Sequence, residues 1–82
     1  MKDLEDRFEK LLKVLPQGLT GADIEQVEEL VQAGELGVAF ENLCTQLYER
    51  SVVVPTWQIE ELSAIGSVMG INPDYWEILA SS

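Results

Sequence analysis

The chain contains no histidine and a single cysteine, Cys44, among its 82 residues. Histidine is the side chain that titrates closest to neutral pH and the commonest general base, so its absence removes many catalytic and metal-binding schemes. A lone cysteine forms no internal disulfide. Because Cys44 falls near an expected apolar helix face, we expect a buried, reduced thiol and a cytoplasmic location.

Other constellations that carry out chemistry are also missing. Adjacent acids such as Glu28 and Glu29 point about 100° apart on a helix, so they do not converge on one substrate atom. The six glycines lack the spacing that holds a phosphate, and no run of acids around a glycine resembles a calcium loop. We therefore expect a binding protein without enzymatic activity, cofactor or metal.

Long hydrophobic runs are absent as well. The longest uncharged apolar run is far too short to cross a bilayer, and the acid-rich first residues do not resemble a signal peptide. Hydrophobic residues nevertheless make up 46% of the chain, which is too many for a disordered acidic segment. The length suits one domain over residues 1–82, in which nearly every apolar residue serves the core.

Basic residues are scarce and unevenly placed. Five lysines and arginines face fifteen acids, and the formal net charge is −10. Four of the five bases lie within the first thirteen positions, where four acids balance them, so the remaining segment holds eleven acids and only Arg50. This surface disfavours direct contact with nucleic acid or anionic membrane and favours a cationic protein partner.

Apolar residues recur at helical spacing along nearly the whole chain. We expect helices over residues 2–15, 22–33 and 35–49, a fourth between Thr56 and Gly70, and a short fifth after Asn72. The expected inward residues are Leu4, Phe8, Leu11, Leu12, Leu15, Ile24, Val27, Leu30, Val31, Leu36, Phe40, Leu43, Leu47, Ile59, Leu62, Ile65, Met69 and Trp76. The predicted fold is all-α, a compact single-domain bundle of four helices plus a short C-terminal helix.

Local signals support these boundaries. Thr20 and Asp23 have the spacing of a capping box, and a tight turn at Gly34 should make helices two and three a hairpin. We expect Thr56 to cap helix four, Gly70 to end it, and Asn72 to cap helix five. Residues 51–55 are either an extended connector or a short edge strand, and the lack of a second strand favours the connector.

Polar residues on helices two and three form the candidate binding surface. The side of helix two opposite its apolar stripe carries acids and an amide but no base; its residues are Glu25, Glu28, Glu29 and Gln32. On helix three a second polar line, flanked by Glu41 and Tyr48, consists of Glu35, Asn42, Gln46 and Glu49. Like charges on one helix face repel each other and lower stability, which favours a partner that binds them. The alternative is an acidic surface that is only solvated.

Two tryptophans lie in the second half of the chain. Trp76, in the short last helix, is expected to close one end of the core. Trp57 lies in the first turn of helix four, away from that helix's apolar stripe. It either packs under the connector or anchors a partner.

Three stretches together resemble the MafI family of bacterial immunity proteins. They are DIEQVEELV (residues 23–31), GELGVAFENLCTQLYE (residues 34–49) and MGINPDYW (residues 69–76). Members of that family are small, acidic, helical proteins encoded beside secreted polymorphic toxins. The resemblance implies that the chain binds a cognate toxin domain, often a nuclease such as an EndoU-type RNase, and so protects the producing cell.

A cationic nuclease cleft would accept an ordered array of carboxylates in place of nucleic acid, so binding would occlude the active site. We expect a monomer when the protein is free. The alternative reading is a small acidic adaptor or regulatory subunit that binds a basic or amphipathic partner through an apolar groove between helices. A self-associating bundle is a third reading, disfavoured because its acidic faces would repel each other.

Overall fold

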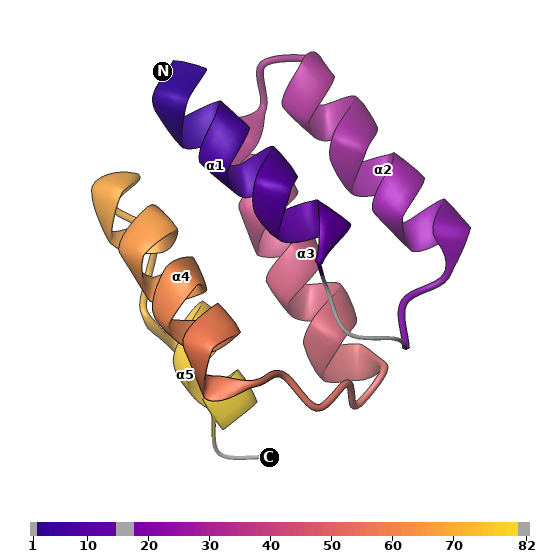
Figure 1. Cartoon of the computed structure of the whole chain (residues 1–82), viewed down its shortest axis with the longest axis vertical. Coiled ribbons are helices and arrows are strands. Elements are labelled where there is room, and N and C mark those ends of the chain that lie inside the picture. The colour runs from indigo at the N-terminus through magenta and orange to yellow at the C-terminus, as the bar shows by residue number, and fades with distance from the viewer. Residues whose placement is uncertain (1, 15–17, 81–82) are drawn as a thin grey trace.

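The computed structural model describes residues 2–14 and 18–80, and these residues form five helices (Figure 1). The helices are α1 (Lys2–Lys13), α2 (Gly21–Gln32), α3 (Leu36–Glu49), α4 (Thr56–Val68) and α5 (Asp74–Ala80). The all-α prediction is therefore confirmed. Helix α1 ends at Lys13, and α2 and α3 each begin within one residue of the expected position. Leu15, expected at the end of the first apolar stripe, lies outside the described residues.

Helix α3 occupies the centre of the structure. It packs against α2 on one side and α5 on the other, while α1 packs against α4 and α2. In the view of Figure 1, α3 passes behind α1, and α5 lies behind α4. The chain measures 30 × 26 × 18 Å, and the α2–α3 hairpin forms one side of it.

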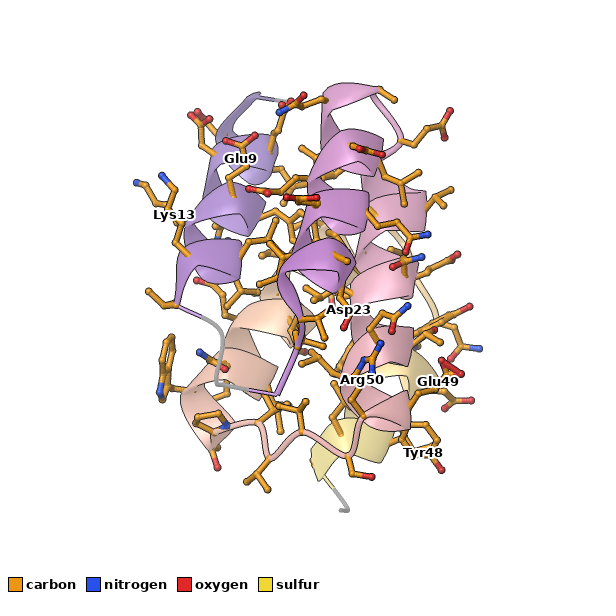
Figure 2. The ribbon with its side chains drawn as sticks, turned by 90° about the vertical axis from the view of Figure 1, so that its right-hand side faces the viewer. Glu9, Lys13, Asp23, Tyr48, Glu49 and Arg50 are labelled. Carbon is orange, nitrogen blue, oxygen red and sulfur yellow. The ribbon has the colours of Figure 1, made fainter. Side chains whose placement is uncertain are left out.

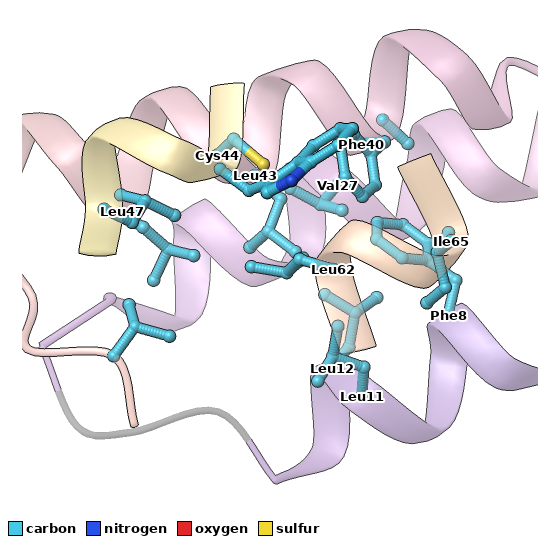
Figure 3. Packing of buried hydrophobic residues seen from close by; sticks show 14 of the residues in the cluster. Phe8, Leu11, Leu12, Val27, Phe40, Leu43, Cys44, Leu47, Leu62 and Ile65 are labelled. Carbon is cyan, nitrogen blue, oxygen red and sulfur yellow. The ribbon is translucent and has the colours of Figure 1, made fainter. Parts of the chain in front are cut away.

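The core lies where these helices meet (Figure 3). Its most enclosed side chains include two aromatic and four aliphatic ones: Phe8, Phe40, Leu43, Leu47, Leu62 and Ile65. The Phe40 ring lies 6.1 Å from the Phe8 ring and meets the Trp76 ring edge-to-face at 5.8 Å. Such aromatic pairs add about 0.5–1.5 kcal/mol each beyond their buried area. Trp76 thus belongs to the core, as predicted.

Gly66 makes room for that tryptophan. A Cβ atom at this buried position of α4 would lie 2.2 Å from Trp76 Cζ3 and 2.9 Å from Phe40 Cζ. Real Cβ atoms do not approach other heavy atoms so closely. The absent side chain is therefore what lets α5 pack its indole directly on the α4 backbone.

Helix α2 is turned slightly from its predicted orientation. Asp23, Val27 and Val31 are the buried residues of this helix, whereas Ile24 is only half-buried and lies outside the core cluster. The prediction that Ile24 lies in the core is wrong. The reason is that Asp23 points inward to accept hydrogen bonds, and its neighbour on the helix is then displaced to the edge.

The helix ends agree with the predicted signals in all but one case. The capping box of α2 is present, Gly70 has the positive φ of a glycine cap, and Asn72 Oδ1 accepts a hydrogen bond from the Asp74 backbone N–H at 2.9 Å. Thr56 is not the cap of α4. It is the first helical residue, because the Pro55 carbonyl accepts the Gln58 and Ile59 backbone N–H groups.

The segment between α3 and α4 is an extended connector, as expected, and forms no strand. Val52 and Val54 are buried, whereas the side chain of Val53 between them is 83% exposed. The connector therefore alternates inward and outward side chains over one end of the core.

Candidate protein-binding surface

The outer face of α2 presents the predicted polar residues to solvent. Glu25, Glu28, Glu29 and Gln32 are all exposed, while Val27 and Val31 on the opposite side are almost fully buried. The placement of these four side chains is therefore as predicted. Three carboxylates along one helix of twelve residues create a strongly negative local field.

Arg50, the only base after residue 13, does not neutralise this face. Its Nε atom lies 2.8 Å from Asp23 Oδ2, and its Nη2 atom donates to Asp23 Oδ1 at 3.1 Å (Figure 2). Such two-point pairing fixes the direction of the guanidinium as well as its position. Because Arg50 pairs with Asp23 on the buried side of α2, it does not pair with the outward glutamates of that helix.

Asp23 serves both the cap and the ion pair. Its Oδ2 atom accepts the Thr20 backbone N–H at 3.0 Å, and its own N–H donates to Thr20 Oγ1 at 3.1 Å. The Thr20 N–H and, after it, the Arg50 guanidinium hold the pKa of Asp23 below its ordinary value of 3.8, against the opposing effect of burial. The carboxylate thus joins the start of α2 to the end of α3.

A base borders the acidic face on the side of α1. Lys13 and Glu9 line a small hollow of about 120 Å³ together with Glu28 and Gln32 of α2 (Figure 2). The sequence places no base on helix two itself, but the fold brings Lys13 next to Glu28. The uncompensated part of the surface therefore extends from Glu25 and Glu29 toward α3, away from α1.

The polar line on α3 is less open than predicted. Glu35 and Glu49 are exposed, but Asn42 and Gln46 are half-buried. The Oδ1 atom of Asn42 is fully covered and has no hydrogen-bond partner among the described residues. Glu35 is the N-cap residue of α3 and the other three lie within the helix, yet only the two acids are exposed.

Tyr48 and Glu41 lie toward α5. Tyr48 is 51% exposed and borders a cavity of about 230 Å³ between α3 and α5, whose other lining residues are Cys44, Thr45, Asn72, Asp74, Tyr75 and Ile78. Burial, and to a smaller extent the charge of Glu41, raises the pKa of the Cys44 thiol to about 12. Cys44 is therefore a neutral, buried thiol at physiological pH, consistent with the predicted structural role.

Trp57 lies apart from these residues. Its side chain is 57% exposed and borders a hollow of about 300 Å³ between α1 and α4, lined also by Arg7, Lys10, Leu11, Val14 and Glu61. Arg7 forms an ion pair with Glu61 across this hollow. The structure thus places Trp57 beside α1, near Arg7 and Lys10, and does not bring it together with the acids of α2 and α3.

Two contacts between residues far apart in the chain were not predicted from the sequence. Gln58 is fully buried, and its Nε2 atom donates to the Val14 carbonyl, 44 positions away in the chain. The Arg50–Asp23 pair joins residues 27 positions apart. For that pair a signal existed, because an antiparallel hairpin brings the end of helix three beside the start of helix two.

The described residues contain no cluster of three or more side chains suited to hold a metal ion. Within the described part of the chain, none of the helices combines the length and the apolar character needed to cross a membrane. Comparison of the chain with protein-family models, with curated proteins and with solved structures gave no match.

Proposed function

We propose that this chain is an immunity protein, which binds a cognate bacterial toxin domain and neutralises it by occluding its active site. The toxin is a cationic nuclease, as the resemblance to the MafI family implies. The observation that carries the proposal is the acidic surface of α2 and α3. Its outward carboxylates are exposed, while Arg50, the one base on these helices, is held by Asp23.

The charge distribution suits inhibition by mimicry. A nuclease cleft is positive because it binds a polyanion, so carboxylates displayed along a helix compete for the same cations. Attraction between the two surfaces speeds their encounter, up to about 10⁸–10⁹ M⁻¹s⁻¹ at low salt. Rapid capture is useful to a protein that must intercept a toxin before the toxin cleaves its substrate.

The α2–α3 hairpin also presents its charges on a rigid frame. The capping box fixes the first turn of α2, and the Arg50–Asp23 ion pair joins that turn to the end of α3. Side chains displayed on a preordered backbone lose less conformational freedom on binding than side chains on a flexible segment. The backbone positions that carry the α2 acids are therefore tied to the end of α3 near Glu49.

The second candidate is an adaptor or regulatory subunit that binds a basic or amphipathic protein. The apolar cavity between α3 and α5 favours it, because such a groove accommodates side chains from a partner helix. The two candidates differ in the consequence of binding. An immunity protein abolishes the activity of a toxin, whereas an adaptor leaves the activity of its partner intact.

The deciding experiment tests the protein against the product of the gene immediately upstream, which the proposal predicts to contain a toxin domain. Co-expression of the two proteins should restore growth, and the purified protein should inhibit nucleic-acid cleavage at a stoichiometric ratio. Replacing Glu25, Glu28 and Glu29 with glutamine should slow association about tenfold at low salt and weaken its salt dependence, with folding unchanged or slightly improved.

A matched control removes three exposed charges from other helices of the molecule. The variant Asp3→Asn, Asp6→Asn and Glu60→Gln changes the net charge equally, but its positions lie on α1 and α4. We expect it to bind the toxin at nearly the parental rate. Equal effects of the two triple variants would assign the attraction to net charge alone, and lack of protection by the parent protein would refute the immunity function.

A further inference from the structure

Tyr48 separates two hollows at the C-terminal end of α3. One is the cavity of about 230 Å³ between α3 and α5. The other, of about 500 Å³, lies against the connector and is lined by Leu47, Tyr48, Glu49, Ser51, Val52, Val53 and Leu79. Tyr48 lines both hollows, and we call the two hollows on either side of it, taken together, the Tyr48 groove.

The Tyr48 groove gathers apolar side chains that remain exposed. Tyr48 is 51% exposed, Val53 is 83% exposed and Ile78 is 42% exposed, and each of them lines one or both hollows. These residues come from α3, the connector and α5, so the fold brings Ile78 close to two residues that are near each other in the sequence. Exposed apolar residues gathered around a depression and rimmed by polar groups mark binding sites, whereas singly exposed apolar residues are ordinary.

The charged residues that line the Tyr48 groove are both acids. Asp74 borders the hollow next to α5, and Glu49 borders the hollow next to the connector. Arg50 follows Glu49 in the chain, but its guanidinium is held by Asp23. The hollow beside Trp57 is different, because Arg7 and Lys10 line it. Of these exposed aromatic residues, Tyr48 is therefore the one in a setting that attracts a cationic partner.

We infer that the Tyr48 groove seats an apolar side chain from a cationic segment of the partner protein. Glu49 and Asp74 pair with lysine or arginine residues that flank this side chain, and Tyr48 packs against it. Thr45 and Asn72 offer hydrogen bonds along the same wall. The inference rests on the proposed function and deepens it, because it separates steering by the α2 acids from anchoring in the groove.

The α2 acids and Tyr48 are expected to affect different rate constants of binding. Exposed charges at a rim chiefly change the association rate, whereas a partly buried aromatic anchor chiefly changes the dissociation rate. A tyrosine gives large contact area with few rotatable bonds, so little conformational entropy is lost when it is covered. Tyr48 meets that description, since half of its side chain is already packed.

The test uses a designed peptide of about 18 residues whose helix carries leucine on one face and lysine on the other. Isotope-labelled protein is titrated with it at physiological salt and followed by NMR. We expect the amide signals of Thr45, Tyr48 and Tyr75 to shift. A second peptide, in which serine replaces every leucine, keeps the charge and should produce only weak, salt-sensitive shifts spread over the acidic residues.

Variants locate the binding site. Tyr48→Ser should weaken binding of the leucine–lysine peptide about tenfold or more, whereas Trp57→Ser, which removes an aromatic residue of similar exposure, should not change it. Val53→Ser, at a nearly fully exposed position, provides a second variant that cannot disturb the core, and we expect it to weaken binding severalfold. Glu49→Gln should reduce the salt dependence of binding.

Two results would overturn the inference. One is a set of signal shifts centred on the α2 acids or on Trp57. The other is equal peptide affinity of the parent protein and the Tyr48→Ser and Val53→Ser variants. The titration contains no toxin, so its failure would leave the proposed immunity function standing on the acids of α2. Conversely, peptide binding in the groove together with failure to protect cells would refute the immunity function and support the adaptor.

Discussion

Replacing Gly66 with alanine tests the packing of the whole C-terminal part of the fold. Within a helix, alanine is favoured over glycine by about 1 kcal/mol, so the change would stabilise α4 if space were available. Space is not available, because the new methyl group would lie 2.2 Å from Trp76 Cζ3. Ordinary contacts at a Cβ atom begin near 3.4 Å, so the indole or α5 would have to move by about an ångström.

The expected magnitude follows from these two opposing effects. Overpacking a well-filled core typically costs about 1–3 kcal/mol. The new Cβ would clash with the rigid Trp76 ring and would also lie 2.9 Å from Phe40 Cζ, so we expect a steric cost of about 3 kcal/mol for Gly66→Ala. Subtracting the helix-propensity gain of about 1 kcal/mol leaves a net destabilisation of about 2 kcal/mol. Urea unfolding followed by circular dichroism measures this difference directly.

Gly37→Ala provides the matched control, because Gly37 is also helical and a Cβ there meets nothing within 4 Å. It should be neutral or stabilise the protein by up to about 1 kcal/mol. A double-mutant cycle sharpens the test. In a Trp76→Leu background the indole ring is gone, so Gly66→Ala should cost less than in the parent protein, with only the contact to Phe40 Cζ at 2.9 Å remaining. If Gly66→Ala is as stable as the parent protein, or if its effect is the same in both backgrounds, the packing of Trp76 on α4 is wrong.

Two further predictions concern the core and the α2 cap. Phe40→Ala should cost about 3–5 kcal/mol, enough to unfold much of so small a domain, and a variant as stable as the parent would contradict the central position of Phe40. Asp23→Asn should lower the urea midpoint at neutral pH, because the ion pair and the charged cap are lost. The pKa of Asp23 in the folded protein lies below the ordinary value of 3.8. The charged carboxylate therefore stabilises the fold at pH values above 3.8, and this stabilisation is lost as the pH falls through the folded pKa. The difference between the urea midpoints of the parent protein and the variant should therefore be constant from neutral pH to about pH 5 and shrink below about pH 4. An unchanged difference at pH 3 would refute the role of the charge.

The helical fold could be predicted from the sequence because it rests on local signals. The 3.6-residue spacing of apolar residues and the Thr20–Asp23 capping box act within one turn of helix, and both predictions are confirmed. The errors arose where a distant part of the chain decides the outcome. Asp23 turns inward to meet Arg50, so Ile24 moves to the edge.

The candidate surface was less predictable than the fold. Which residues face outward on α2 followed from helical geometry alone. Whether those residues share a surface with Tyr48 or Trp57 depends on how helices pack, and periodicity carries no information on that. The Tyr48 groove is built from α3, the connector and α5, and the sequence offers no local pattern that would place Ile78 of α5 beside Tyr48.

The separation of roles on α2 has an evolutionary consequence. Its inner residues, such as Val27 and Val31, lie in the core, while the side chains of the neighbouring Glu25 and Glu29 are exposed. Substitutions at exposed positions of this kind usually change stability by no more than about 0.5 kcal/mol. Descendants of this chain can therefore exchange these side chains one at a time while every intermediate stays folded, so a change of partner would not have to pass through an unstable protein.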